Sequence, residues 1–186
     1  MILGCALLVS AVGCGRPFDV KTATRPAVAN YDSKATLDSV SVEAQAVTDE
    51  NYLYDNFDAN LILAGVMPVR VRLTNVSTDS VAAKDARFEL EAQGQHYKAV
   101  EPKKALKRLM SYYEISAYSK AGYRKSLEAI ASHALDLETP IDAGQSRQGL
   151  VFFLLPVAAS QTALTLLVDN LDEKQHSRPP TALKLN

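Results

Sequence analysis

Short segments in which apolar and polar residues alternate constrain the fold of this chain more than any other feature of its sequence. Residues 40–46 read Val-Ser-Val-Glu-Ala-Gln-Ala, and residues 69–73 read Val-Arg-Val-Arg-Leu. Because successive side chains of a strand point to opposite faces, this alternation is typical of a strand with one buried and one solvated face. Further segments that favour strands occur at residues 88–91, 97–100, 150–155, 164–168 and 183–185. Turn-forming residues separate them, with a hairpin expected around Gln93-Gly94-Gln95, so the pattern predicts a mainly β protein built as an antiparallel β-sandwich.

One stretch of the chain breaks this β pattern. Pro102 suits the first position of a helix. Apolar residues then recur at helical spacing, namely Ala105, Leu106, Leu109, Met110 and Tyr113, followed after a break at 119–122 by Leu127, Ile130, Ala131 and Ala134. Such spacing places apolar side chains on one face of a helix. We therefore expect residues 102–135 to form a helical insertion between two strands of the sandwich.

Residues 150–155 are continuously apolar and read Leu-Val-Phe-Phe-Leu-Leu. A strand with one wet face alternates, so both faces of this strand must be covered. The core of the sandwich can cover only one of them. We expect the other face to be covered by the apolar stripe of the insertion, which contains Leu106, Leu109, Met110, Leu127 and Ile130.

The N-terminal end carries a separate signal. Residues 1–12 are almost wholly apolar, which is too short for a bilayer span of about 20 residues but matches a signal peptide. The following Ala11-Val12-Gly13-Cys14 resembles the lipobox of bacterial lipoproteins, in which the cysteine is diacylated and becomes the mature N-terminus. This resemblance implies a signal peptide over 1–13 and a membrane anchor of acyl chains, palmitate among them, at Cys14. An ordinary signal peptide and an apolar N-terminal strand are the alternatives.

The residues after this cysteine are expected to connect the anchor to a single domain. Residues 15–36 are polar, contain Pro17 and Pro26 and show no sustained period. We therefore expect a lipidated N-terminus and tether over 14–36, which holds the domain off the membrane, and a domain over 37–186. Gly15, which stands where an acidic residue would retain the protein at the inner membrane, resembles the signal for sorting to the outer membrane.

Two segments also resemble a known kind of domain. The strand that ends in Arg72-Leu73-Thr74-Asn75, together with Gly144–Pro156 and its Gly149-Leu150-Val151-Phe152-Phe153, resembles immunoglobulin-like domains of uncharacterised bacterial lipoproteins. The resemblance covers about half of the chain and rests on strand patterns. It implies an immunoglobulin-like antiparallel β-sandwich in an accessory protein of the cell envelope.

Familiar catalytic and metal-binding patterns are absent from the sequence. Both cysteines, Cys5 and Cys14, lie at the N-terminal end, which excludes a disulfide scaffold, a zinc-thiolate site and a cysteine nucleophile from the domain. The histidines His96, His133 and His176 have no partner at ligand spacing. A hydrolase would need His96 or His133 to meet carboxylates in space.

Other segments are equally unlike known sites. The segment 144–149 has the wrong spacing for a G-x-S-x-G nucleophile elbow and precedes a strand. The acidic segment 49–60, expected to form a loop or a short helix, lacks the central glycine and the terminal glutamate of a calcium-binding EF-hand loop. We therefore expect no enzymatic activity, no cofactor and no metal.

The predicted helices carry a concentration of basic and aromatic residues. These are Lys103, Lys104, Lys107, Arg108, Tyr112, Tyr113, Tyr118, Tyr123, Arg124 and Lys125, joined by Lys120. Over the same span Glu114 is the only acid. Such residues suit a membrane interface, an anionic glycan or a protein-binding surface. The alternative is a solvated helix surface whose tyrosines pack on the sandwich.

These observations predict a non-enzymatic, membrane-anchored lipoprotein of the bacterial envelope, attached to the outer membrane and facing the periplasm. It would bind an envelope protein or an anionic glycan or lipid surface. The net charge of −1 and the exported location argue against nucleic acid. The alternative function is a small-ligand or lipid-binding lipoprotein with a cavity between the sandwich and the helices.

Overall fold

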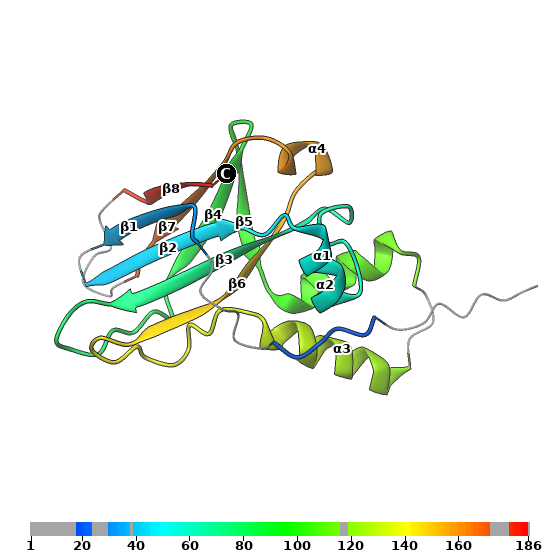
Figure 1. Ribbon diagram of the computed structural model, residues 1–186, viewed down its shortest axis with the longest axis horizontal. Helices are drawn as coiled ribbons and strands as arrows, with labels where there is room; N and C mark the ends of the chain where they lie inside the picture. The colour runs from blue at the N-terminus through cyan, green and yellow to red at the C-terminus, as the bar shows by residue number, and fades with distance from the viewer. Residues whose placement is uncertain (1–17, 24–29, 38, 116–118, 172–178, 186) are drawn as a thin grey trace, which may run out of the picture.

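The computed structural model describes residues 18–23, 30–37, 39–115, 119–171 and 179–185. Its elements in chain order are β1 (Ser33–Leu37), β2 (Val40–Ala46), α1 (Glu50–Phe57), β3 (Val66–Asn75), β4 (Arg87–Ala92), β5 (Gln95–Val100), α2 (Pro102–Tyr112), α3 (Lys120–Ser132), β6 (Ser146–Leu154), α4 (Val157–Ser160), β7 (Leu164–Asp169) and β8 (Thr181–Leu185). Figure 1 shows α1, α2 and α3 gathered at one end of the molecule, with the strands filling the other.

The strands form a nearly closed sandwich. They pair in the order β1-β2-β3-β6-β5-β4-β7-β8, and every pairing is antiparallel. Strands β5 and β6 are joined only through Ala99 opposite Phe153 and Val100 opposite Phe152, so the sheet folds there into two layers. At the opposite edge, β8 lies against β1 and β2. The structure confirms the predicted fold class, a mainly β antiparallel sandwich with an inserted helical segment.

The predicted hairpin joins β4 to β5. Gln93 and Gly94 occupy its turn with φ of 53° and 71°. Positive φ at both central residues is the geometry of a type I′ turn, which matches the right-handed twist of the flanking strands. One predicted strand is longer than expected, because β3, expected over residues 69–73, begins at Val66 and contains Pro68.

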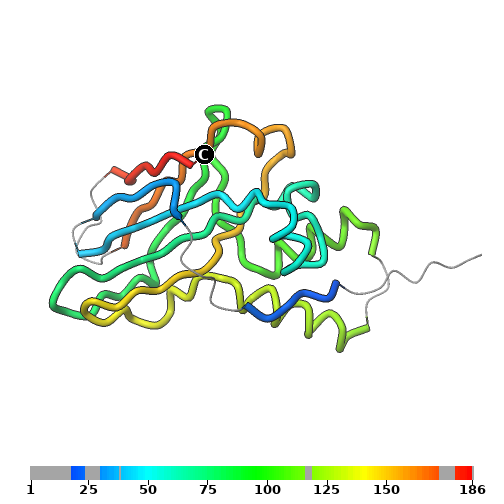
Figure 2. The backbone as a smooth tube through the Cα atoms, in the orientation of Figure 1, coloured from blue at the N-terminus to red at the C-terminus, as the bar shows by residue number. Residues whose placement is uncertain are grey.

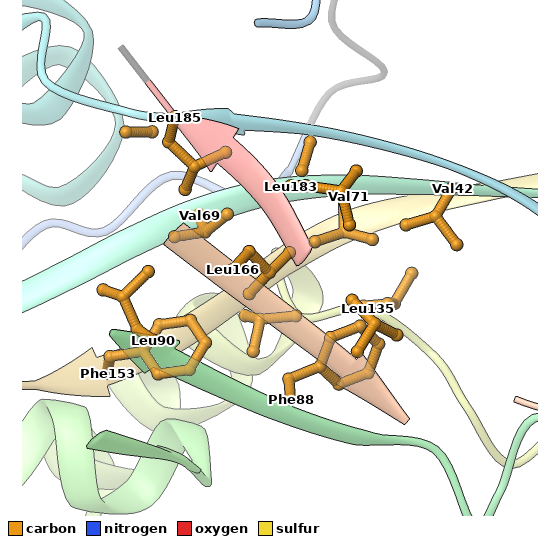
Figure 3. Close-up of a cluster of buried hydrophobic side chains, with 14 of the residues drawn as sticks. Val42, Val69, Val71, Phe88, Leu90, Leu135, Phe153, Leu166, Leu183 and Leu185 are labelled. Carbon is orange, nitrogen blue, oxygen red and sulfur yellow. The ribbon is translucent and has the colours of Figure 1, made fainter. Parts of the chain in front are cut away.

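A hydrophobic core fills the space between the two layers. Figure 3 shows Val69 and Val71 from the first layer facing Leu90, Leu166 and Leu183 from the second. All five side chains are at most 1% exposed. The alternating residues of β3 therefore face inward at 69 and 71, as the sequence pattern predicted.

A second core lies between the first layer and the helices. Leu150 and Phe152 of β6 point outward into it and meet Leu106, Leu109 and Ile130 from the insertion. Val151 and Phe153 point the other way, into the sandwich. Burial of a side chain such as Leu106 contributes about 1.5–3 kcal/mol relative to exposure. The prediction that the insertion covers the outer face of residues 150–155 is confirmed.

The helix boundaries differ in detail from those expected. Ser119 caps α3, and its Oγ accepts a hydrogen bond from the Gly122 amide at 3.0 Å. The predicted break at 119–122 was therefore wrong, because the capped helix begins at Lys120 and Gly122 lies in its first turn. The acidic segment forms the short helix α1, where Asp49 accepts a hydrogen bond from the Tyr52 amide at 2.9 Å.

The stretch predicted to be a tether is packed on the domain wherever it is described. Phe18 and Val20 are 8% and 5% exposed and belong to the helical core. Figure 2 shows residues 18–23 running alongside α3, and Ser33–Leu37 forms β1, paired with β2. For these residues the expectation of a tether that holds the domain away from the membrane was wrong. The predicted signal peptide, Cys14 and Gly15 lie outside the described residues.

Candidate functional site

The lysines of α2 form an exposed basic face. Lys103, Lys104 and Lys107 are all exposed, and none makes an ion pair with a described residue. Helix α2 contains no acidic residue. Lys103 and Lys107 stand one turn apart, where like charges destabilise a helix by a few tenths of a kcal/mol. This face is therefore charged and unneutralised.

Arg108 has a structural role instead. Its Nε donates a hydrogen bond to the Ala64 carbonyl oxygen at 2.8 Å. The carbonyl belongs to the turn before β3, in which Gly65 has a φ of +73°. Arg108 thus connects α2 to the first layer of the sandwich.

Two cations of α3, Arg124 and Lys125, are paired with acidic neighbours, whereas Lys120 is exposed and makes no ion pair with a described residue. Arg124 lies 3.8 Å from Glu128 one turn later, and Lys125 lies 3.6 Å from Asp19. All four side chains are more than 70% exposed, so these ion pairs contribute little to stability. The basic face of α2 does not continue onto them.

Two of the four tyrosines, Tyr113 and Tyr123, belong to the fold. Tyr113 packs edge-on against Phe18 and Tyr112, with ring centroids 5.6 and 4.9 Å away. Burial raises the pKa of the Tyr113 hydroxyl above its ordinary value. Tyr123 is half-buried against the helical core, whereas Tyr112 is 46% exposed. Tyr118 lies outside the described residues, so Tyr112 is the only one of the four tyrosines that is both described and exposed.

A polar pocket, which the sequence did not reveal, lies on the outer face of the first layer. Its volume is about 620 Å³. Strands β3 and β6 form its floor, and α1, the end of α3 and Ala23 form its rim. The lining residues are Ala23, Tyr52, Arg70, Ser132, His133, Gln145, Ser146, Arg147, Gln148, Gly149 and Leu150.

Arg70 is the most unusual residue of this pocket. Its side chain is buried, with the residue only 9% exposed, yet it forms no ion pair with any described carboxylate. Its Nη1 donates to Gln45 Oε1 at 2.8 Å, and the Tyr52 ring centroid lies 5.1 Å from its guanidinium carbon. The next arginine on the same face, Arg72, is in contrast paired with Glu43 at 3.2 Å.

The other ionisable groups of the pocket are engaged elsewhere. Arg147 pairs with Asp136 at 3.1 Å and donates to the carbonyl oxygens of Thr139 and Pro140. His133 is 6% exposed, and its Nε2 hydrogen-bonds to the Lys21 carbonyl oxygen at 2.8 Å. Burial lowers the pKa of His133 below its ordinary value of 6.5, so the ring is neutral at pH 7.

The chain after α3 reaches the pocket because of one glycine. The Leu150 amide donates to the His133 carbonyl, and the Leu135 amide donates to the Leu150 carbonyl, at 2.7 and 3.0 Å. A Cβ at Gly149 would lie 2.5 Å from the Leu135 Cα. Only glycine permits this close approach, which fixes His133 at the rim.

Of the described histidines, only His96 lies close to a carboxylate. His96 lies on β5, 3.5 Å from Glu89, far along the chain from His133. Within the described ranges no three His, Cys, Asp or Glu residues are placed to hold a metal ion. His176 lies outside these ranges. No described helix has the length and apolarity needed to span a membrane.

A second hollow is an open groove of about 680 Å³. It lies beside the contact between β5 and β6, where the two layers of the sandwich diverge. Its lining includes Phe88, Val100, Leu135, Leu137 and Val151. The groove opens between the two layers beside the start of α2, whereas the polar pocket lies between the sandwich and the helices. The alternative function, a small-ligand or lipid-binding lipoprotein, requires a cavity between the sandwich and the helices. The polar pocket lies in that position.

Comparison with known proteins identifies no family. No family model and no curated protein matches the chain. Several solved bacterial structures share a similar arrangement of the backbone. A conserved hypothetical protein from Bacillus anthracis is 8% identical with a TM-score of 0.41, over 81% of this chain and 94% of that one. A "putative lipoprotein" from Bacillus subtilis is 14% identical with a TM-score of 0.46, over 84% of this chain and 39% of that one.

An uncharacterised β-sandwich protein from Clostridium difficile is a third such structure. It is 12% identical with a TM-score of 0.36, over 75% of this chain and 85% of that one. At these levels of identity the likeness concerns the fold alone.

Proposed function

We propose that this protein is a lipid-anchored, non-enzymatic binding protein of the bacterial envelope whose helical end faces the membrane. The observation that carries the proposal is the position of Phe18, which packs on Tyr113 directly after α2. Ser126 of α3 also holds this residue, since its Oγ donates to the Phe18 carbonyl oxygen at 3.2 Å. The start of the described chain is thus fixed to the helices.

An acyl anchor at Cys14 would stand close to this point. Cys14 precedes Phe18 by four residues, and four residues of extended chain span at most about 14 Å. The helical end of the domain would therefore lie near the membrane surface. This differs from a long tether, which would leave the orientation of the domain free.

The basic face of α2 supports the same orientation. Lys107 precedes Tyr113 by six residues, which is about 9 Å of helix. Each lysine close to an anionic membrane surface contributes about 1 kcal/mol of attraction. Tyr112 is of the type enriched at membrane interfaces. The acyl chains would supply one membrane signal, and Lys103, Lys104 and Lys107 a second.

The proposal also covers the lack of catalytic activity and the location of the protein in the bacterial envelope. Neutral His133 is engaged by a main-chain carbonyl, and no described Asp or Glu lines the polar pocket. Both observations support binding without catalysis. Gly15 after the cysteine supports the outer membrane, with the domain in the periplasm.

Amine labelling of acylated protein in vesicles tests the orientation. With phosphatidylglycerol in the vesicles, Lys103, Lys104 and Lys107 should react at least threefold more slowly than in detergent, as measured by mass spectrometry. Lys98 and Lys184 are exposed on the strands and serve as internal controls whose rates should not change. The proposed orientation would be contradicted if labelling slowed equally at all five lysines. It would also be contradicted if labelling of the α2 lysines did not slow.

A further inference from the structure

We infer that the polar pocket beside Arg70 binds a small polar anion, whose carboxylate or phosphate oxygens pair with the Arg70 guanidinium. This site lies apart from the lysines of α2 and does not depend on the acyl anchor.

Arg70 stands at the boundary between an apolar and a polar half of one sheet face. It lies opposite Gln45 of β2 and Leu150 of β6, and Leu150 belongs to the core beneath the helices. Two residues further along β3, Arg72 lies opposite Glu43 and Gln148. Arg70 is thus the first polar residue beyond the helical cover, where α1 and the end of α3 overhang it.

The charge of Arg70 is incompletely compensated by the protein. A guanidinium carries five N–H donors, and the described contacts use one of them, in the hydrogen bond to Gln45. The Tyr52 ring adds a cation–π contact but no hydrogen-bond acceptor at its face. Arginine is seldom buried without a paired carboxylate, because removal of its charge from water is costly.

The surrounding pocket is positively charged. Among the described residues, its lining contains Arg70 and Arg147 and no Asp or Glu. Asp136 neutralises Arg147, but it lies outside the lining. An anion that enters would therefore meet one unpaired guanidinium and no repelling carboxylate. A planar guanidinium binds a carboxylate or phosphate through two parallel hydrogen bonds, which are among the strongest in proteins.

The rest of the lining indicates the size and polarity of the ligand. A volume of about 620 Å³ lies within the range of small-molecule sites. Ser132, Ser146, Gln145 and Gln148 offer hydroxyl and amide groups around the guanidinium. These groups fit a ligand with hydroxyl or amide groups beside its anionic end better than they fit an acyl chain.

Titration of the purified full chain with two probes tests this inference. Inorganic phosphate and succinate are titrated separately by calorimetry in a buffer of low ionic strength. We expect saturable binding of at least one of them with a stoichiometry of one, and the one that binds tells a phosphate ligand from a carboxylate ligand. Binding of neither probe would mean that water alone fills the pocket, and the inference would be wrong.

Three variants assign the binding to Arg70. Arg70→Lys keeps the charge but loses the planar fork, so its affinity should fall at least tenfold. Arg72→Lys makes the same change two residues away on the same face and should keep the affinity within twofold. Equal losses in the two variants would indicate binding to surface charge and would overturn the inference.

The third variant separates a ligand-binding role from a structural one. Arg70→Met removes a buried charge, so without added anion its melting temperature should equal or exceed that of the wild type. Saturating probe should raise the melting temperature of the wild type and leave that of Arg70→Met unchanged. A variant that is destabilised without anion, or one that is still stabilised by the probe, would contradict the inference.

Discussion

Tyr113 and Asn60 are joined by two hydrogen bonds. The Tyr113 hydroxyl accepts from the Asn60 amide at 3.1 Å and donates to the Asn60 carbonyl oxygen at 3.3 Å. Asn60 is only 2% exposed, so its backbone has little access to water. One hydroxyl thereby ties the end of α2 to the chain that leads from α1 into β3.

This relationship predicts a stability effect. Tyr113→Phe leaves the Asn60 amide and carbonyl without their partner, which should lower the free energy of unfolding by about 1–3 kcal/mol. Tyr112→Phe removes the same atom from the exposed neighbour and should change it by less than about 0.5 kcal/mol. Urea denaturation followed by circular dichroism measures both. Equal stability of the two variants would show that the hydrogen bonds to Asn60 are unimportant.

The helical core predicts that the insertion is part of the fold. Leu106 is fully buried against β6, so Leu106→Ala should cost about 2–5 kcal/mol in unfolding free energy. Lys107→Ala, on the exposed face of the same helix, should cost less than about 0.5 kcal/mol. Replacement of residues 103–132 by a Gly-Ser linker should expose Leu150 and Phe152 and cause aggregation. A soluble deletion variant with an unchanged melting temperature would disprove this role.

His133 predicts a dependence of stability on pH. Its folded pKa lies below the unfolded value of 6.5, so below that pH the unfolded chain binds more protons than the native state. Stability should be complete above pH 6.5 and should fall as the pH drops through the folded pKa. His133→Gln should flatten this decline between pH 7 and 5. His96→Gln, at an exposed position, is the control and should retain the wild-type slope.

The sequence predicted the layers of the fold but not its edges. The continuous apolar run at residues 150–155 required cover on both faces, and this requirement correctly placed the insertion on β6. Strand β1 was missed because Ser33–Leu37 offers only five residues of pattern between polar neighbours. Phe18 and Val20 were missed for the same reason, since two apolar residues near Pro17 form no period.

The polar pocket could not have been predicted from the sequence. Arg70 occupies a polar position of an alternating strand, and that pattern predicts exposure to solvent. It is buried because α1 and the end of α3 overhang this part of the face. Tyr52 and His133 lie 18 and 63 residues from Arg70 in sequence. Among the predicted surface residues, Arg108 was assigned to the surface by type alone, and Tyr113 was counted both in the apolar stripe and on the surface. The hydrogen bonds of both residues place them in the fold.

The basic face of α2 predicts salt-dependent binding to membranes. For protein without an acyl chain, Lys103, Lys104 and Lys107 all changed to Glu should weaken binding to phosphatidylglycerol vesicles at least tenfold. The effect should shrink as salt rises above about 0.1 M, where charges are screened beyond about 10 Å. Changing Arg87, Lys98 and Lys184 to Glu alters the net charge equally on the strands and serves as the control. Equal weakening in both variants, measured by cosedimentation, would show that only total charge matters.

The most direct test of the lipid-anchored account is metabolic labelling with an alkyne analogue of palmitate. We predict that the wild-type protein and Cys5→Ala are both labelled and partition into the detergent phase. Cys14→Ala should lose the label and leave that phase, because Cys14 is the residue that carries the acyl chains. Label that persists in Cys14→Ala and disappears in Cys5→Ala would contradict the account, as would a wild-type protein without label.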